Sequence, residues 1–287
     1  MGVEIQALLQ GLPLSRGGDR AARIAPRPAA LPRLSDSPPR LRDARIGRKT
    51  VTRLSRSRSR RLDLACPRVA GAVIDHLRRG PVLIVLPSVY ALMAAPTALG
   101  VAGLNGMKRR LPGKNYGTAV GRLSKFWDLV EESSVPSGFD GSLDLETSHD
   151  IFFRCRVGGE RIQTPVIRGG THQTLILGGA YRSLMCEIEE AFHHQADPEL
   201  FAGHRFSAPL ITSCNLSGDP LGSITDESRA RDFAEQRGVG LWITGSLPST
   251  ESGSYPILEL EKSGISIRRE GGSIREREIY QRFRKGN

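Results

Sequence analysis

The sequence has few cysteines and few aromatic residues, and it has no long apolar runs. Only four cysteines occur among 287 residues, and no two of them form a CxxC pair. A disulfide scaffold is therefore not expected, and reduced thiols in a cytosolic protein are the default. The longest apolar segment, 81–95, is interrupted by Pro87 and Ser88 and is too short to span a bilayer, so we expect no membrane partner. We also expect no secretory signal peptide, because no apolar core stands near the first residue.

Several common catalytic motifs are missing as well. GxSxG, Walker A and GxGxxG patterns do not occur, which disfavours a serine hydrolase, a P-loop NTPase and a dinucleotide enzyme. No His or Cys spacing typical of a zinc site is present, so we expect no metal-ligating residues. A lone His172 is more simply a structural residue, and His193 with His194 is more simply a surface pair.

Acidic residues are scarce at the beginning of the chain. Residues 1–61 carry fifteen Lys and Arg but only four Asp and Glu, an excess of eleven that equals the net charge of the whole chain. We expect residues 1–62 to form a disordered tail rich in Arg, Pro and Ser, and residues 63–287 to form one formally neutral folded domain. A solvated tail is the favoured interpretation, with a cytoplasmic location. An organelle-targeting peptide and an RNA-binding arm stay open as alternatives.

From residue 66 onward, helical periodicity alternates with short apolar runs. This alternation predicts an α/β domain built on one twisted sheet. The predicted helices cover 69–77, 97–110, 123–131, 181–193 and 226–237, the last with Thr225 as its N-cap. The predicted strands cover 82–86, 118–121, 151–157, 165–168, 209–212, 241–244, 257–260 and 265–268.

The segment 108–114, with the sequence KRRLPGK, is the most informative part of the chain. A helix end often carries solvated cations, which is enough to explain Arg109. Pro and Gly in the following turn can redirect the chain, so that Lys108, Arg110 and Lys114 point into one volume. Such a volume suits a polyphosphate or a carboxylate.

Two further elements carry polar groups at the ends of predicted strands. Thr212, Ser213 and Asn215 stand where a strand enters a loop that ends at Gly218, and ligands of α/β proteins often bind at such strand ends. Their hydroxyl and amide groups can both donate and accept hydrogen bonds. Arg168 stands at another predicted strand end, beside two glycines, where it could contact phosphate.

Read together, these motifs resemble the YrdC-like family over roughly residues 66–275. The family's K-x-R-P-x-x-K, VR-x-x-x-H and S-A-N-x-SG patterns are matched at 108–114, at 167–172 and at 213–218. Looser matches are found at 87–92 for PT-x-TVYGL and at 269–274 for R-P-G-A-I. The best-known activity of that family is the synthesis of L-threonylcarbamoyl-AMP, which is used to make threonylcarbamoyladenosine in tRNA.

The resemblance implies an open, twisted mixed sheet with flanking helices and a concave groove. It implies an ATP-dependent nucleotidyltransferase that uses threonine, bicarbonate, ATP and Mg²⁺, and that serves tRNA or tRNA-modifying proteins. It also implies roles for residues. Lys108 and Arg110 would be catalytic, and Ser88 and Tyr90 would line the amino-acid pocket. The residues implied to hold the nucleotide are Lys114, Arg168, Thr212, Ser213, Asn215 and Arg269.

The sequence departs from the family pattern on the amino-acid side. The PT-x-TVYGL stretch has lost two residues, and the W-P-G-P motif is absent. A divergent paralogue that makes another carbamoyl-adenylate is therefore one alternative. A non-catalytic RNA-binding module is another, although the neutral charge of the folded part disfavours it.

Overall fold

The computed structural model describes residues 59–139, 149–245, 253–271, 277–278 and 280–281. The predicted tail therefore lies outside the described residues, except at its end. Strand β1, Arg60–Asp63, belongs to the sheet, where it pairs in parallel with β8. The boundary predicted at residue 62 is thus a few residues late. Among the described residues, no helix has the length and apolar character needed to cross a membrane.

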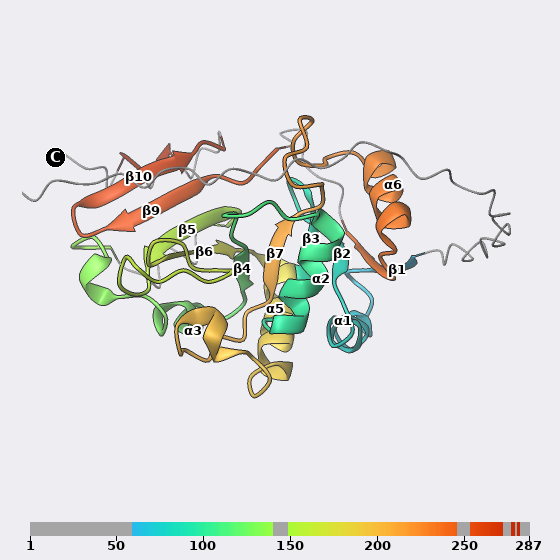
Figure 1. Ribbon diagram of the computed structural model, residues 1–287, viewed down its shortest axis with the longest axis horizontal. Helices are drawn as coiled ribbons and strands as arrows, with labels where there is room; N and C mark the ends of the chain where they lie inside the picture. The colour runs from blue at the N-terminus through green and yellow to red at the C-terminus, as the bar shows by residue number, and fades with distance from the viewer. Residues whose placement is uncertain (1–58, 140–148, 246–252, 272–276, 279, 282–287) are drawn as a thin grey trace, which may run out of the picture. The chain divides into compact units, whose positions relative to one another are not determined.

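Ten strands of the described chain form one mixed sheet (Figure 1). Their order across the sheet is β1-β8-β2-β3-β7-β4-β6-β5-β9-β10. The remaining strands are β2 Val82–Val85, β3 Tyr90–Ala94, β4 Gly117–Val120, β5 Ile151–Arg156, β6 Thr171–Ile176, β7 Leu210–Ser213, β8 Leu241–Thr244, β9 Ile257–Glu261 and β10 Gly264–Arg269. Parallel pairs occur at β1–β8, β2–β8, β4–β6 and β5–β9, and the other pairs are antiparallel.

Helices cover both faces of this sheet, and each face has its own apolar core. Side chains of α1 and α5 belong to one core, and side chains of α2, α3 and α6 belong to the other. Strand β3 separates the two cores, because Tyr90 and Leu92 point to one face while Ala91 and Met93 point to the other. The helices are α1 Val69–Leu77, α2 Ala98–Lys108, α3 Leu123–Trp127, α5 Gly179–Ala191 and α6 Glu227–Arg237, with short 3-10 turns at Glu132–Ser134 and Pro198–Phe201. The predicted α/β class and mixed sheet are confirmed.

The strand predicted at residues 165–168 is wrong, and the glycine turn that follows these residues explains why. Residues 165–168 do not form a strand. They lead instead into a tight turn in which Gly169 and Gly170 have φ values of +57° and +71°. Two successive positive φ angles suit a type I′ hairpin turn, which glycine adopts without strain. The strand is β6, which starts after the turn and was missed because His172 and Gln173 hide its apolar pattern.

Smaller differences have local causes. Asp226, and not Thr225, caps α6, because its side chain accepts the backbone N–H of Arg229. Helix α3 ends at Trp127, four residues before the predicted end. Strand β3 was not predicted either, since its five consecutive buried residues give no alternating pattern.

Candidate anion-binding site

Five basic side chains from distant parts of the chain line one cavity of 520 Å³. They are Arg110, Lys114, Arg154, Arg168 and Arg269. No Asp or Glu is among the described residues that line this cavity, which we call the cationic compartment. A concave surface with charges of one sign attracts counter-ions, so the compartment favours an anionic ligand.

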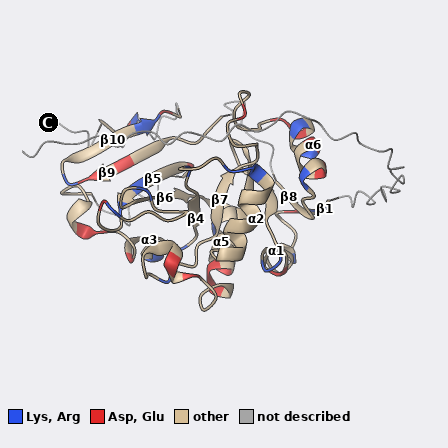
Figure 2. Cartoon of the chain, viewed as in Figure 1, with Lys and Arg blue, Asp and Glu red and all other residues tan. Residues whose placement is uncertain are grey.

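The fold brings these cations together from four segments of the chain. Figure 2 shows in blue how Lys and Arg are distributed along the ribbon, including on α2 and β10. Arg110 and Lys114 follow the end of α2, where Arg109 adopts a left-handed conformation with φ of +46° and turns the chain out of the helix. Arg168 begins the glycine turn before β6. Arg154 lies on β5, and Arg269 is the last residue of β10.

Arg110 is held firmly in place. Its guanidinium lies over the ring of Tyr116, 4.3 Å from the centroid, and its nitrogens donate to the backbone carbonyls of Lys114 and Asn115. The Asn115 amide in turn donates to the carbonyls of Thr164 and Ile167 at 2.5 and 2.9 Å. A guanidinium fixed by stacking and by backbone acceptors is preorganised, so binding a ligand does not require it to be ordered first.

A second, smaller cavity of 190 Å³ adjoins the first. We call it the hydroxyl compartment, because the hydroxyl-bearing residues Thr212, Ser213, Ser223, Ser254 and Tyr255 line it. Part of its wall is apolar and comprises Leu86, Val89, Ala91, Phe152, Leu175 and Ile211. Four residues, Arg110, Asn115, Gln173 and Arg269, line both compartments. The two cavities therefore lie side by side and share part of their walls, one charged and the other amphipathic.

The sequence did not single out Arg154 or Gln173, although both belong to this site. Arg154 donates to Oε1 of Gln173 at 2.7 Å, and the two residues face each other across the β5–β6 pair. A signal for Arg154 was present, since an arginine amid the apolar residues of a predicted strand needs a polar partner or a ligand. Gln173 gave no comparable signal.

Tyr255 and Ser254 are two further residues of the site that the sequence did not single out. Tyr255 is buried at the hydroxyl compartment, and its Oη accepts the backbone N–H of Ser88 at 3.4 Å. Arg269 Nε donates to the carbonyl of Tyr255 at 2.6 Å. The contact between Arg269 and Tyr255 therefore joins the end of β10 to the wall of the site.

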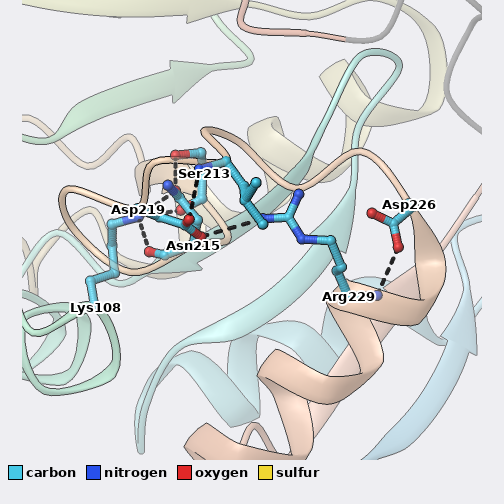
Figure 3. A network of polar contacts seen from close by, with 7 residues as sticks. Lys108, Ser213, Asn215, Asp219, Asp226 and Arg229 are labelled. Atoms are coloured by element: carbon cyan, nitrogen blue, oxygen red, sulfur yellow. Dashed lines mark hydrogen bonds and ion pairs between the residues drawn. The ribbon is translucent and has the colours of Figure 1, made fainter.

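Lys108 lies beside the site and does not line either compartment. Its side chain is only 2% exposed, and Nζ donates to the carbonyls of Ser213 and Asn215 at 2.5 and 2.7 Å and to Asn215 Oδ1 at 3.2 Å (Figure 3). Burial, together with the nearby charges of Arg110 and Lys114, lowers the pKa of Lys108 to about 7. All three donor positions of the ammonium face oxygens of the protein itself.

Ser88 and Tyr90, predicted to hold an amino acid, also lie outside the residues that line the two compartments. Tyr90 is 1% exposed and packs edge-on against Trp242 on the opposite face of the sheet from Val89 and Ala91. Ser88 is linked to the site through Tyr255, whose Oη accepts its backbone N–H. Asn215 too lies behind the cavity wall, where its Oδ1 accepts from Ser213 Oγ at 2.6 Å.

His172 is a buried structural residue, in line with the sequence interpretation. Its Nδ1 lies 2.9 Å from the carbonyl of Val166, and its Nε2 lies 2.9 Å from Thr118 Oγ1. Since a carbonyl can only accept, Nδ1 carries the proton and Nε2 accepts from the threonine hydroxyl. Burial lowers the pKa of His172 to about 4, so the ring is neutral at pH 7.

Comparisons with known proteins bear on the fold. No family model and no curated protein matches the sequence. Among solved structures, a variant of Sua5 from P. abyssi aligns with 77% of this chain and 63% of its own length, at a TM-score of 0.55 and 14% identity. YciO from E. coli aligns with 75% of this chain and 97% of its own length, at a TM-score of 0.53 and 16% identity.

Sua5 and YciO are YrdC-like proteins. The chain has the YrdC-like fold. A phosphate- and nucleotide-bound HypF also aligns, over 70% of this chain but only 29% of its own, at a TM-score of 0.50 and 15% identity. At these identities the likeness establishes the YrdC-like fold alone. The present chain also spans less than two thirds of the P. abyssi protein, whose full activity therefore does not transfer with the fold.

Proposed function

We propose that this protein binds ATP in the two adjoining compartments and makes L-threonylcarbamoyl-AMP from threonine, bicarbonate and ATP, with release of pyrophosphate. The observation that carries the proposal is a cavity with five basic side chains and, among its described lining residues, no carboxylate, beside a smaller cavity with hydroxyl and apolar walls. A triphosphate suits the first compartment, and an amino acid or its carbamate suits the second. The YrdC-like fold is consistent with this pairing.

The reaction has two steps whose charges match the site. The amine of threonine reacts with bicarbonate to give a carbamate and water. A carbamate oxygen then forms a bond to the α-phosphorus of ATP, and the bond from that phosphorus to the bridging oxygen of pyrophosphate breaks. Negative charge accumulates on the leaving pyrophosphate, and Arg110, Arg154 and Arg269 lie where fixed cations would stabilise it.

Mg²⁺ does not fit this site as a resident metal. Hard cations prefer carboxylate oxygens, and the lining residues that the structure describes in the two compartments include no Asp or Glu. The described residues also contain no group of three or more His, Cys, Asp or Glu that could hold a metal ion. We propose that Mg²⁺ enters only as part of the ATP substrate, held by the phosphates.

A second amino-acid substrate is the alternative that the geometry favours most. Val89, Phe152 and Ile211 place apolar surface beside the hydroxyl groups, and Tyr90 points to the opposite face of the sheet. An apolar side chain would pack against this wall as well as threonine does. The same carbamoyl-adenylate chemistry would then serve a different amine.

The biological setting is proposed with the activity. Threonylcarbamoyl-AMP would be consumed in tRNA modification, in the cytoplasm or, if the Arg-rich segment is a targeting peptide, in an organelle. tRNA or tRNA-modifying proteins would then be the macromolecular partners. A non-catalytic RNA-binding module is the remaining alternative, with the cations contacting phosphodiesters.

Pyrophosphate release by the full-length protein tests these alternatives. With ATP present, we expect release that requires both bicarbonate and threonine. Release with valine or another amine in place of threonine would favour the second substrate. If no amine supports release and calorimetry detects no ATP binding, the enzyme proposal is wrong. RNA affinity that disappears when residues 1–58 are deleted, with β1 retained, would then support the binding module.

A further inference from the structure

Lys108 joins the end of α2 to the loop that follows β7. Three oxygens of Ser213 and Asn215 surround its ammonium group, and the carbonyl of Lys108 also accepts the backbone N–H of Ser217 at 2.9 Å. Both the side chain and the main chain of one residue therefore fasten the loop 213–217. Figure 3 shows the lysine reaching into this loop, where Ser213 and Asn215 lie at its ammonium group.

The same loop is also fastened at its far end. Arg229 of α6 pairs with Asp219 at 3.3 Å, and Asp226 accepts the backbone N–H of Arg229 at the start of that helix. The loop is thus held between α2 and α6. Only its first residue, Ser213, lines the hydroxyl compartment. Asn215 Oδ1 accepts from Ser213 Oγ and from Lys108 Nζ, so one amide oxygen links the lysine to the serine hydroxyl.

We propose that Lys108 is a positioning residue, which acts on the ligand through Asn215 and Ser213 and does not touch it. This rests on the ligand site proposed above, and it replaces the catalytic role that the sequence motif implied. A lysine ammonium can donate three hydrogen bonds, and three protein oxygens already accept hydrogen bonds from Nζ. A phosphate could bind Nζ only by displacing acceptors from a group that is almost completely buried.

A double-mutant cycle on ATP affinity separates positioning from direct contact. Lys108→Met and Asn215→Ala should each weaken ATP binding by about tenfold, as expected for one lost charged hydrogen bond. If the lysine acts through the asparagine, the double variant binds no more weakly than the weaker single variant. If Lys108 contacts phosphate directly, the two losses multiply to about a hundredfold, and the proposal is wrong. Lys262→Met, on the exposed turn between β9 and β10, removes a lysine charge as a control and should leave affinity unchanged.

Hydrogen exchange on the free full-length protein provides a readout that needs no ligand. The backbone amide of Cys214 donates to the carbonyl of Tyr90, and that of Ser217 donates to the carbonyl of Lys108. Their exchange rates therefore report whether the loop 213–217 keeps these hydrogen bonds. Both single variants should exchange faster at these amides, while the amides of β4 stay protected as in the wild type. Unchanged exchange in both variants would show that Lys108 and Asn215 do not hold the loop 213–217 in place, and it would overturn the positioning role even if ATP binds. Faster exchange in a protein that binds no ATP would support the role of Lys108 in holding the loop and would refute the proposed ligand instead.

Discussion

The two lysines at the ends of the segment 108–114 have the same charge and opposite surroundings. Lys108 is buried and gives its three hydrogens to protein oxygens, whereas Lys114 is exposed and lines the cationic compartment. Their spacing along the chain made them look equivalent. The difference teaches that a cation near a site is committed to the fold when protein acceptors surround it, and is available to a ligand when it is exposed at the wall of a cavity.

Removing an acceptor from the buried lysine should have the largest effect on stability. In the Asn215→Ala variant, Lys108 loses an oxygen partner inside the protein, and Ser213 loses the acceptor of its hydroxyl. We expect the free energy of unfolding to fall by about 1.5–3 kcal/mol, measured by urea denaturation. The Lys114→Met variant, at the exposed end, should stay within about 0.5 kcal/mol of the wild type. Equal losses in the two variants would contradict the comparison.

Lys114, the exposed lysine of the segment 108–114, should affect ligand binding more than stability. Replacing Lys114 and Arg168 by Met removes two of the five cations of the compartment without breaking a side-chain contact that holds the fold. We expect ATP affinity to fall by about tenfold, or about 1–2 kcal/mol after allowance for screening by solvent, with an unchanged unfolding midpoint. Calorimetry at two salt concentrations provides the check, because the variant should depend less on salt than the wild type.

How far the sequence could predict this arrangement depended on the kind of signal. The helices around Val69–Leu77 and Glu227–Arg237 were predictable, because apolar periodicity or capping residues mark them. Four of the residues that the sequence motifs grouped together, Arg110, Lys114, Arg168 and Arg269, line one cavity, and their role in binding stays a prediction.

Burial and side-chain direction could not be predicted from the same residues. Nothing local distinguishes Lys108 from Lys114, because the acceptors of Lys108 lie more than a hundred residues away in sequence. Tyr90 points away from the site because β3 alternates between two cores, and neither core can be seen in the segment 87–92 alone. Arg154 and Gln173 required the pairing of β5 with β6, which is a long-range contact.

The pH dependence of stability should mark Lys108 as the buried member of the pair. Its pKa is about 7 in the folded protein and near 10.5 when unfolded, so above pH 7 the unfolded chain binds more protons and stability rises with pH. Relative to Lys108→Met, the wild type should gain about 1 kcal/mol in unfolding free energy between pH 7 and pH 8. The difference between wild type and Lys114→Met should stay flat over the same range. If the unfolding free energy of the wild type does not rise relative to that of Lys108→Met, the ammonium group of Lys108 is in contact with water and is not buried.

The smallest effect should distinguish two tyrosines in the same way. Tyr255 lines the hydroxyl compartment, and burial raises its pKa, so its phenol keeps a proton to donate. Tyr90 packs against Trp242 on the other face of the sheet. In the pyrophosphate-release assay, Tyr255→Phe should raise the KM for the amino acid about threefold, the equivalent of one neutral hydrogen bond, because an acceptor on the substrate loses its donor. Tyr90→Phe should leave that KM unchanged. A larger rise in KM for Tyr90→Phe than for Tyr255→Phe would show that the amino acid binds at Tyr90, as the sequence motif implied.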